Sequence, residues 1–496
     1  MSSTMSHPQN QAMEPVGIGA GALTGHDVHR EAPKGPQGLP PSNFYAPFRP
    51  KEIAGAVALI GYLVVLCAVW AAMMIFGDWA IVGLFRVLGA SLPAAELWGN
   101  AIANILFVVL AFVMLLATLL TMGERKWSAF IQDRIGPNRA RLPGLKNHAF
   151  WGIPHILADV GKMMTKEEVV PAMGNQTLFH LAPAIAFAPA VILFAVIPLS
   201  PDFTLWGEHL HIGVAPHLNQ GLLYIFAIAS IGVLGTSLGG WASNNKYGLL
   251  GAMRASAQMI SYEVTLGLTL VGLMLIFGTL RLDSMMSQQT GHLFGFLPNW
   301  GVFYQPLAIV AYFAAASAEI KRAPFDLPEG DSEIVGYFIE YSGLKFGIYM
   351  IGEFVEVVVF AGLFTTLFFG GYHLPWGEGW LAGHLGPTWL AGLQVLTFLA
   401  KTVFFCWLSL AVRWTYPRFR YDQVMNLGWK LLLPASIANV ALTGVVILAG
   451  GMHGAAIMGI VELVILLAWV VGAVGVRRSG KETLLPTESA AASEHG

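Results

Sequence analysis

Long apolar runs alternate with shorter polar segments along most of the chain. A run of about 20 apolar residues is long enough to cross about 30 Å of hydrocarbon as a helix. Ten runs approach this length, at approximately residues 53–76, 98–122, 178–199, 221–242, 259–280, 302–318, 346–370, 388–412, 428–450 and 455–476. The pattern predicts an all-α fold, a polytopic membrane bundle of about ten transmembrane helices.

The segment between the second and third runs, residues 123–177, is too long to be a simple connector. Within it, apolar residues recur at helical spacing, with charged residues on the opposite face: Ile153, Ile156, Leu157, Val160, Met163 and Met164 against Asp159, Lys162 and Lys166. A helix of this kind lies along a membrane surface or covers a neighbouring bundle. We therefore expect an amphipathic surface helix in this loop.

Composition agrees with a membrane protein, since 55% of the residues are hydrophobic and 12% are aromatic. Both cysteines, Cys67 and Cys406, lie inside apolar runs, where they cannot form a zinc or iron–sulfur ligand set. No basic, aromatic stripe typical of nucleic-acid binding is present. Residues 1–52 and 477–496 lack an apolar periodicity, so we expect both tails to be disordered.

The distribution of basic residues predicts the orientation. When the loops are assigned alternately to the two sides of a membrane, 24 of the 27 Lys and Arg residues fall on one side. Arg86 and Arg281 fall on the other side, and Lys401 lies within an apolar run. The positive-inside rule places the basic side, with both termini, in the cytoplasm.

The most charged segment, residues 318–347, lies between two apolar runs. It contains six acids and three bases, although only 11% of the whole chain is charged: Glu319, Asp326, Glu329, Asp331, Glu333 and Glu340, with Lys321, Arg322 and Lys345. Carboxylates at the edge of hydrocarbon are costly unless they are paired, protonated or hydrated. The segment is therefore a candidate functional site, although a solvated cytoplasmic loop has a similar composition.

Further charges lie inside the apolar runs, at Glu263, Glu353, Glu356, Lys401 and Glu462. Each costs about 2.5–3.5 kcal/mol at the centre of a bilayer, so each is expected to face protein or water. With Glu319 and the loop acids, the first four can form a proton-conducting chain, because neighbouring carboxylates in a low dielectric titrate at raised, coupled pKa values. Neutral, hydrogen-bonded packing residues are the alternative, and we favour it for the isolated Glu462.

A second polar group opens the long loop, with Arg125, Gln132, Arg134 and Arg139 around a Gly-Pro-Asn turn. Such a group can line a polar mouth through which an amphiphilic ligand leaves the lipid, although ordinary positive-inside flanking explains the same residues. A third group, with Glu208, His209, His211 and His217, lies in an outer loop. Surface histidines explain it better than a metal, so we assign no metal site.

Four segments resemble the quinone-site membrane subunit of respiratory complex I, which is the H subunit of the bacterial enzyme and subunit 1 in mitochondria. They are ERKWSAFIQDRIGPNRA (124–140), WASNNKYGLLGAMRASAQMISYEV (241–264), AEIKRAPFDLPEGDSEIVGYFIEYSGLKFG (318–347) and RYDQVMNLGWK (420–430). The resemblance covers approximately residues 98–450, an eight-helix core. Residues 53–97 and 451–476 would add an extra helix at each end.

The resemblance implies a role for each candidate residue. Those that would lie along or near a quinone tunnel are Arg125, Gln132, Arg134, Arg139, Arg254 and Phe325. Those that would pass the effect of quinone reduction towards a proton-pumping arm are Asp326, Glu329, Asp331, Glu333 and Glu340 in the loop and Glu263, Glu319 and Glu353 in the membrane. Their chemistry fits this role, because quinone reduction consumes protons and creates negative charge beside them.

The resemblance also implies the partners. The chain would bind no cofactor of its own, and electrons from NADH would pass through FMN and iron–sulfur clusters in partner subunits to a quinone substrate. Partners would be iron–sulfur and quinone-site subunits of a peripheral arm, small membrane-arm subunits and lipids of the bacterial inner membrane. The chain departs from the usual family residues at Ala129, Lys321, Asp331 and Phe338, and Lys321 makes the tunnel side more basic.

Two other classes of protein fit part of the pattern. The membrane subunit of an energy-converting hydrogenase shares the ancestry without using quinone, but the intact 124–140 segment and full acidic loop argue against it. A secondary transporter is disfavoured because the chain has no internal repeat and no matched pair of broken helices.

Overall fold

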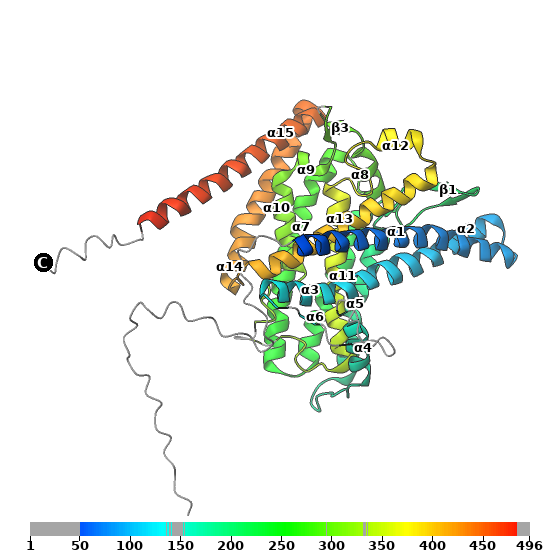
Figure 1. Cartoon of the computed structure of the whole chain (residues 1–496). Coiled ribbons are helices and arrows are strands. Elements are labelled where there is room, and N and C mark those ends of the chain that lie inside the picture. Colours follow the sequence, from blue (N-terminus) through cyan, green and yellow to red (C-terminus); the bar gives the residue numbers. More distant parts are fainter. Residues whose placement is uncertain are drawn as a thin grey trace, which may run out of the picture. The chain divides into compact units, whose positions relative to one another are not determined.

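The computed structural model describes residues 50–134, 136–137, 140, 152, 154–293, 295–330, 334 and 336–483. The chain divides into a unit of residues Met1–Ala58, of which only the first turns of helix α1 are described, and a unit of residues Leu59–Gly496. The second unit is a bundle of helices (Figure 1). Within the described residues the strands are two short antiparallel pairs, β1 (Phe203–Leu205) with β2 (Glu208–Leu210) and β3 (His292–Leu293) with β4 (Leu297–Pro298).

Eight helical segments in the described part are long and apolar enough to cross a membrane. Six of them are single helices: α1 (Pro50–Val87), α5 (Gln176–Leu193), α6 (Gly221–Ala242), α7 (Lys246–Phe277), α11 (Gly343–Phe368) and α13 (Pro387–Thr415). The other two are composed of consecutive helices. One consists of α2 (Leu92–Asn104), η2 (Ile105–Met114) and α3 (Leu115–Ile131), and the other of α14 (Tyr421–Asn426), η5 (Leu427–Leu432) and α15 (Leu433–Thr483). The predicted all-α polytopic fold is confirmed.

The structure differs from the predicted ten spans in one place. The two runs predicted at 428–450 and 455–476 are separated at Gly451, whose φ of 59° and ψ of −149° are not helical, so the break between them is confirmed. The run at 302–318 is broken at Gln305 into α9 (Gly301–Tyr304) and α10 (Pro306–Glu319). Pro306 suits the start of a helix, where its missing N–H removes no helical hydrogen bond. With 14 residues, α10 is only about 21 Å long.

The ends of the chain are described in part. Residues 1–49 and 484–496, which contain most of both predicted disordered tails, lie outside the described residues. Helix α15 is described to Thr483, past residue 477 where the predicted C-terminal tail begins, and the tail itself stays a prediction.

The remaining helices are short: α4 (Pro154–Thr165), η4 (Phe194–Val196), α8 (Leu282–Gln288) and α12 (Glu378–His384). Helix α4 is the predicted amphipathic helix. Its Met163 side chain lies against Gly347 of α11, whereas Leu157, Val160 and Met164 are exposed. The helix therefore covers the start of α11 and leaves one apolar face uncovered.

Helix α11 lies at the centre of the bundle. In its apolar window 89% of the residues are buried, compared with 39% for α6 and α13, and it packs against α3, α4, α5 and α13. Lys401 of α13 holds the turn that follows α11, because Nζ donates hydrogen bonds to the carbonyl oxygens of the C-cap residue Phe369 (2.7 Å) and of Gly371 (2.9 Å) and His373 (2.7 Å) beyond it. Buried carbonyl groups outside a helix or sheet need a hydrogen-bond partner elsewhere.

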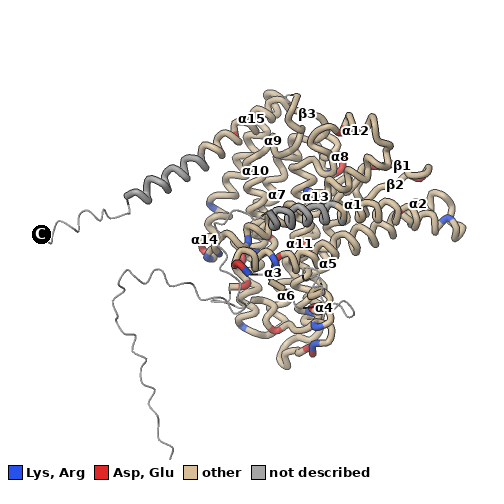
Figure 2. The backbone as a smooth tube through the Cα atoms, viewed as in Figure 1, with Lys and Arg blue, Asp and Glu red and all other residues tan. Residues whose placement is uncertain are grey.

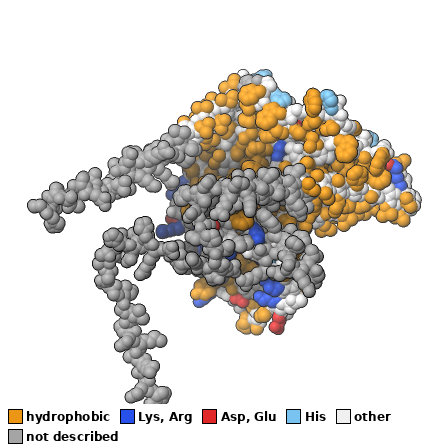
Figure 3. Space-filling model, viewed as in Figure 1, with side chains coloured by type: hydrophobic (Ala, Val, Ile, Leu, Met, Phe, Trp, Pro, Cys, Tyr) orange, Lys and Arg blue, Asp and Glu red, His pale blue; other side chains and the backbone are white. Residues whose placement is uncertain are grey.

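Charged residues are unevenly distributed. Figure 2 shows Lys, Arg, Asp and Glu concentrated at the end of the bundle that carries α4, α14 and the end of α3. In Figure 3 the visible surface at the opposite end is covered mainly by hydrophobic side chains. An apolar band next to a charged end is the surface expected for a helical membrane protein with its charged loops on one side.

Helices α5 and α6 approach closely at Gly235. A Cβ atom at this position would overlap the backbone of Ala186, whereas one at Gly232, on the same helix, would meet nothing within 4 Å. Closely packed helices in a membrane commonly have small residues where the backbones meet.

We expect Gly235→Ala to separate α5 from α6 and to lower the thermal stability of the purified protein by several degrees, as overpacking costs about 1–3 kcal/mol. Gly232→Ala is the matched control, which should keep or raise the stability because Ala favours a helix. Equal melting temperatures for the two variants would contradict the close contact.

Candidate functional site

The acidic loop, which we define as residues 320–342, joins the end of α10 to the start of α11. Gln258 of α7 holds the beginning of the loop, since its Nε2 donates hydrogen bonds to the carbonyl oxygens of Ala318 (2.7 Å) and Phe325 (2.7 Å). The ring of Phe325 packs between Tyr262 and Phe419, with centroid separations of 5.5 Å to each. The loop is thus fixed against α7 before its acids are reached.

Lys321 points from the loop towards the acids of α11. Its side chain is only 3% exposed, and Nζ lies 3.3 Å from Oε2 of Glu356. Glu353 and Glu319 are also buried, and Oε2 of Glu319 has no hydrogen-bond partner among the described residues. Burial lowers the pKa of the Lys321 amine, but the charges of Glu356, Glu353 and Glu319 outweigh burial and raise the pKa above its usual value.

Arg322, the next residue, points to a different helix. Its Nη1 lies 3.0 Å from Oε2 of Glu124 in α3, and Nη1 of Arg413 lies 2.8 Å from the other carboxylate oxygen. The Arg322 guanidinium also lies 4.0 Å from the ring centroid of Phe354, a cation–π distance. Glu124 therefore stands between two arginines from distant parts of the chain.

Two further acids lie in the described part of the loop. Nη2 of Arg418 is 2.6 Å from Oδ2 of Asp326, while Oδ1 of Asp326 is buried without a partner among the described residues. Burial raises the pKa of Asp326 despite the opposing charges of Arg418 and Arg413. Burial, with the nearby charges of Glu353 and Asp326, raises the pKa of Glu329 well above its usual value. Both carboxyl groups are thus poised to take up protons.

The other predicted coupling acids lie at the edges of this cluster. Ser230 donates a short hydrogen bond to Glu263, and Asn245 donates one to Glu340 (2.7 Å). Glu263 is close enough to act electrostatically on Glu319. Asp331 and Glu333 lie outside the described residues.

Lys401 is separate from the acidic loop. Its contacts lie at the end of α11, where it also approaches the ring of Trp300 at 4.4 Å. Phe369 follows Glu356 by 13 residues, which corresponds to about 20 Å along a helix. Its predicted part in proton coupling stays a prediction, with no contact joining it to the loop acids in the described part.

A narrow pocket opens beside the Lys321 cluster. Three charged residues, two tyrosines and small or apolar residues of α5, α6 and α11 line it: Lys321, Glu353, Glu356, Tyr337, Tyr349, Ala186, Phe187, Gly232, Thr236, Ile348 and Gly352. Such a polar lining suits water or a mobile ammonium group better than an apolar ligand.

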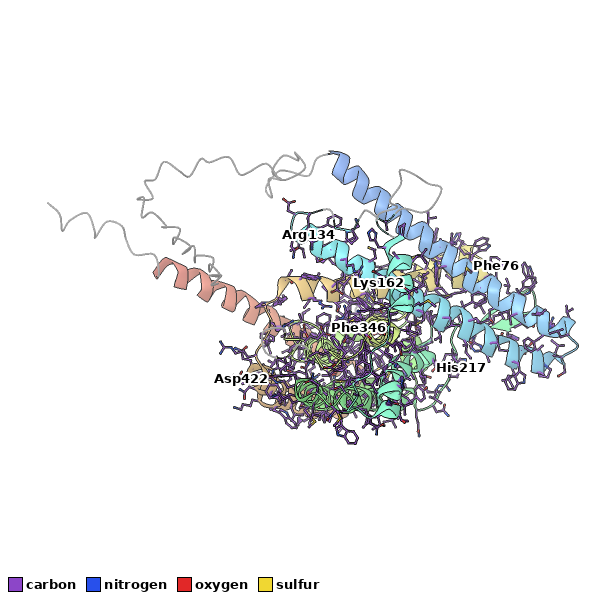
Figure 4. The ribbon with its side chains drawn as sticks, turned by 90° about the horizontal axis from the view of Figure 1, so that it is seen from below. Phe76, Arg134, Lys162, His217, Phe346 and Asp422 are labelled. Atoms are coloured by element: carbon purple, nitrogen blue, oxygen red, sulfur yellow. The ribbon has the colours of Figure 1, made fainter. Side chains whose placement is uncertain are left out.

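The predicted tunnel residues fall into two groups. Arg125, Gln132 and Arg134 lie at the exposed end of α3, where Arg125 forms an ion pair with Asp159 of α4 and Arg134 donates to Gln132 at 2.8 Å. Figure 4 labels Arg134 at this edge of the bundle, with Lys162 on the neighbouring α4. Arg139 lies outside the described residues.

Arg254 of α7 and Phe325 of the acidic loop form the second group. The guanidinium of Arg254 lies 5.7 Å from the ring centroid of Tyr421, at the start of α14. Phe325 is buried beside Tyr262 and Phe419, as described above. The structure therefore brings Arg254 and Phe325 to the segment at 419–421, and leaves Arg125, Gln132 and Arg134 beside α4.

The outer-loop histidines do not converge on one point. Arg86 of α1 pairs with Glu208, and Nδ1 of His217 lies 2.8 Å from Oδ2 of Asp283. Burial raises the pKa of Asp283, but hydrogen bonds from Arg281 and His217 outweigh burial and bring the pKa to about 2. In the described residues no group of three His, Cys, Asp or Glu side chains has a metal-binding arrangement.

Sequence reasoning does not identify the cations of the site. By pattern alone, Lys321 and Arg322 are positive-inside residues, and Arg413 and Arg418 are loop flanks. Their partners, Glu356, Glu124 and Asp326, lie between 35 residues away, for Lys321 and Glu356, and 289 residues away, for Arg413 and Glu124. The one available signal is energetic: a buried acid requires a cation, and these are the nearest basic residues on the same side of the membrane.

We expect Glu124→Ala to leave Arg322 buried without a counter-ion, and to destabilise the protein by about 3–5 kcal/mol. The control is Asp159→Ala, which removes the partner of Arg125, a side chain that is 47% exposed. Exposed pairs contribute about 0–1 kcal/mol. Thermal inactivation of the purified protein measures both, and similar losses would refute the structural importance of the buried pair.

We expect Lys401→Met to lower thermal stability, because an unsatisfied buried carbonyl group costs about 1–3 kcal/mol. Lys430→Met, at an exposed position of η5, is the control. A variant that keeps its stability but loses proton translocation would instead assign Lys401 to proton coupling.

Comparisons with known proteins agree on one family. A family model described as NADH dehydrogenase matches residues 103–444. The chain is 43% identical to the NADH-quinone oxidoreductase H subunit of Flavobacterium johnsoniae, over 69% of this chain and 94% of that protein. It is 44% identical to the H 1 subunit of Geobacter metallireducens, over 69% and 94%, and 42% identical to the H subunit of Thermomicrobium roseum, over 71% and 98%.

The matched region contains the acidic loop, Glu124 and all the described residues of the candidate site. The predicted resemblance is thereby confirmed, and the first apolar helix lies outside the matched region. The chain belongs to the H-subunit family of NADH-quinone oxidoreductases, as a multi-pass membrane subunit of an oxidoreductase complex.

Proposed function

We propose that this subunit forms a quinone-binding tunnel together with peripheral-arm subunits, and that its acidic residues couple quinone reduction to proton translocation. The main support for the proposal is that two neighbouring residues of the acidic loop contact different helices. Lys321 contacts Glu356 among the acids of α11, while Arg322 contacts Glu124 in the segment that bears the predicted tunnel residues. A displacement of this loop acts on both regions at once.

The chemistry of quinones supports this assignment. Reduction of a quinone to a quinol adds two electrons and two protons, so negative charge develops unless protons arrive with the electrons. Buried carboxyl groups with raised pKa values, such as Asp326 and Glu329, respond to nearby negative charge by binding protons. The change in charge then alters their attraction for Arg418 and Arg413.

The two groups of tunnel residues have different tasks in the proposal. Arg125, Gln132 and Arg134 lie at the exposed end of α3, beside an amphipathic helix, and would receive a quinone headgroup arriving from lipid. Phe325 belongs to the acidic loop and Arg254 lies beside Tyr421, and both would contact the ligand or the tunnel wall. Glu319, Glu353 and Glu263 would carry the effect further into the membrane.

The partners follow from the same proposal. The chain binds no cofactor, and electrons from NADH reach the quinone through FMN and iron–sulfur clusters of partner subunits. Peripheral-arm subunits close the tunnel on the cytoplasmic side, small membrane-arm subunits extend the proton path, and lipids surround the apolar band. Both termini are cytoplasmic in this arrangement, which is supported by the excess of Lys and Arg on that side.

We expect Asp326→Asn and Glu319→Gln to reduce quinone-reductase activity or the number of protons translocated per electron by about tenfold or more, in line with the loss of a proton-transfer group. The complex should still assemble, because both substitutions keep the volume of the side chain. Activity with a soluble quinone and proton uptake by vesicles containing the complex are the measurements.

Asp422→Asn is the control, since Asp422 is an exposed acid on α14 and lies at the edge of the bundle in Figure 4. It should keep the activity and proton yield of the unmodified complex. Normal rates and proton yields in both Asp326→Asn and Glu319→Gln would refute the coupling role.

A further inference from the structure

We propose that Lys321 is an internal counter-ion shared by Glu356, Glu353 and Glu319, and that its ammonium group controls how many protons these carboxyl groups hold during quinone reduction. Lys321 is a positioning residue in this scheme, because it contacts carboxylates of its own chain rather than the reacting atoms. The inference rests on the proposed function, which supplies the redox event to which the cluster responds.

The backbone and side chain of Lys321 are both unusual. Its φ of 60° lies in the left-handed region, which residues other than Gly, Asn and Asp seldom adopt. Its side chain is nevertheless buried, with 3% exposed, and Nζ lies 3.3 Å from Oε2 of Glu356. An exposed turn would let a lysine reach water, so the inward direction of this ammonium group depends on the acids that receive it.

No other basic residue in the described part forms an ion pair with Glu356. Arg322 and Arg413 are near enough to attract Glu353, but both contact Glu124 directly. Lys321 is thus the cation of the cluster that pairs directly with an acid of α11, whereas the two guanidinium groups pair with Glu124.

Titratable or charged groups reach the Lys321 cluster from several elements, whereas α5 and α6 contribute only uncharged residues to its pocket. Glu353 and Glu356 come from α11, Glu319 from the end of α10, and Glu263 of α7 acts on Glu319. Arg322 and Arg413 attract Glu353, and Glu329 of the loop is near enough to repel it. Tyr337 and Tyr349 line the same pocket as Lys321. Carboxylates are in the majority next to the ammonium group, so removal of Lys321 leaves an excess of negative charge.

The pocket brings the alternative partners of the ammonium group together. Lys321, Glu353 and Glu356 all line it, beside the hydroxyl group of Thr236 and the two tyrosines. Protonation of Glu356 would release the ammonium group towards Glu353 or Glu319, whose Oε2 has no partner in the described part. The cluster can therefore move positive charge without moving a helix.

The test uses the complete complex, purified with its partner subunits, carrying Lys321→Met. Loss of a positive charge makes the neighbouring carboxyl groups hold protons to higher pH. We expect the acidic limb of the quinone-reductase pH profile to shift to higher pH by about 1 unit or more, the usual effect of a charge at this distance. Lys321→Arg, which retains the charge, should keep the original profile. Rates are normalised to NADH oxidation with an artificial electron acceptor, which measures the amount of assembled complex.

The double variant Lys321→Met/Glu356→Gln separates a counter-ion from a packing residue. The double variant removes one charge of each sign, so its pH profile should return towards that of the unmodified complex. If Lys321→Met alone fails to assemble, the double variant should restore assembly. An unchanged profile in Lys321→Met, or a double variant no better than the single one, would overturn the proposal. Absence of quinone-linked proton uptake in the unmodified complex would instead refute the proposed function itself.

Discussion

A helix surrounded on nearly every side cannot carry carboxylates unless cations reach them, and this constraint organises the centre of the protein. Helix α11 is the most buried of the long helices in the described part and holds Glu353 and Glu356. Isolated charges in such a place would cost several kcal/mol each. The acidic loop meets the need from one end, because Lys321 and Arg322 enter the bundle before α11 begins. At its other end α11 is followed by a turn, and Lys401 donates three hydrogen bonds to carbonyl groups of that turn.

The cations of the loop also connect parts of the chain that are distant in sequence. Glu124 is paired with Arg322 and Arg413, and Asp326 is paired with Arg418. These contacts join α3, the acidic loop and the segment between α13 and α14. A proton bound or released at one acid changes the charge felt by all the others, since the low dielectric screens it little. Coupling of this kind is reciprocal. If ligand binding favours protonation of the acids, then protonation of the acids favours binding of the ligand.

The apolar runs predicted most of the helices, because burial in hydrocarbon imposes a length and a composition that can be read directly. The break at Gln305 escaped prediction, since it lies inside an apolar run and depends on backbone angles, whereas the break at Gly451 falls between two predicted runs. The candidate acids can be found because each is rare in its surroundings. Their cations cannot be assigned in the same way, because a Lys or Arg near a membrane surface is common and its partner is fixed only by tertiary packing. Gln258 leaves no signal at all, since an uncharged amide does not stand out within α7.

The short length of α10 has a consequence for the electric field across the membrane. A helix of about 21 Å crosses only about two thirds of a 30 Å hydrocarbon layer, and it ends at Glu319. The loop that follows carries charges and contributes Lys321 to a polar pocket beside α11. A membrane potential falls mainly across the least polarisable part of its path, which here would be the apolar length of α10. Under the proposed coupling role of Glu319, protons that reach it from the loop side would cross only a small fraction of the potential, and their binding would respond weakly to voltage.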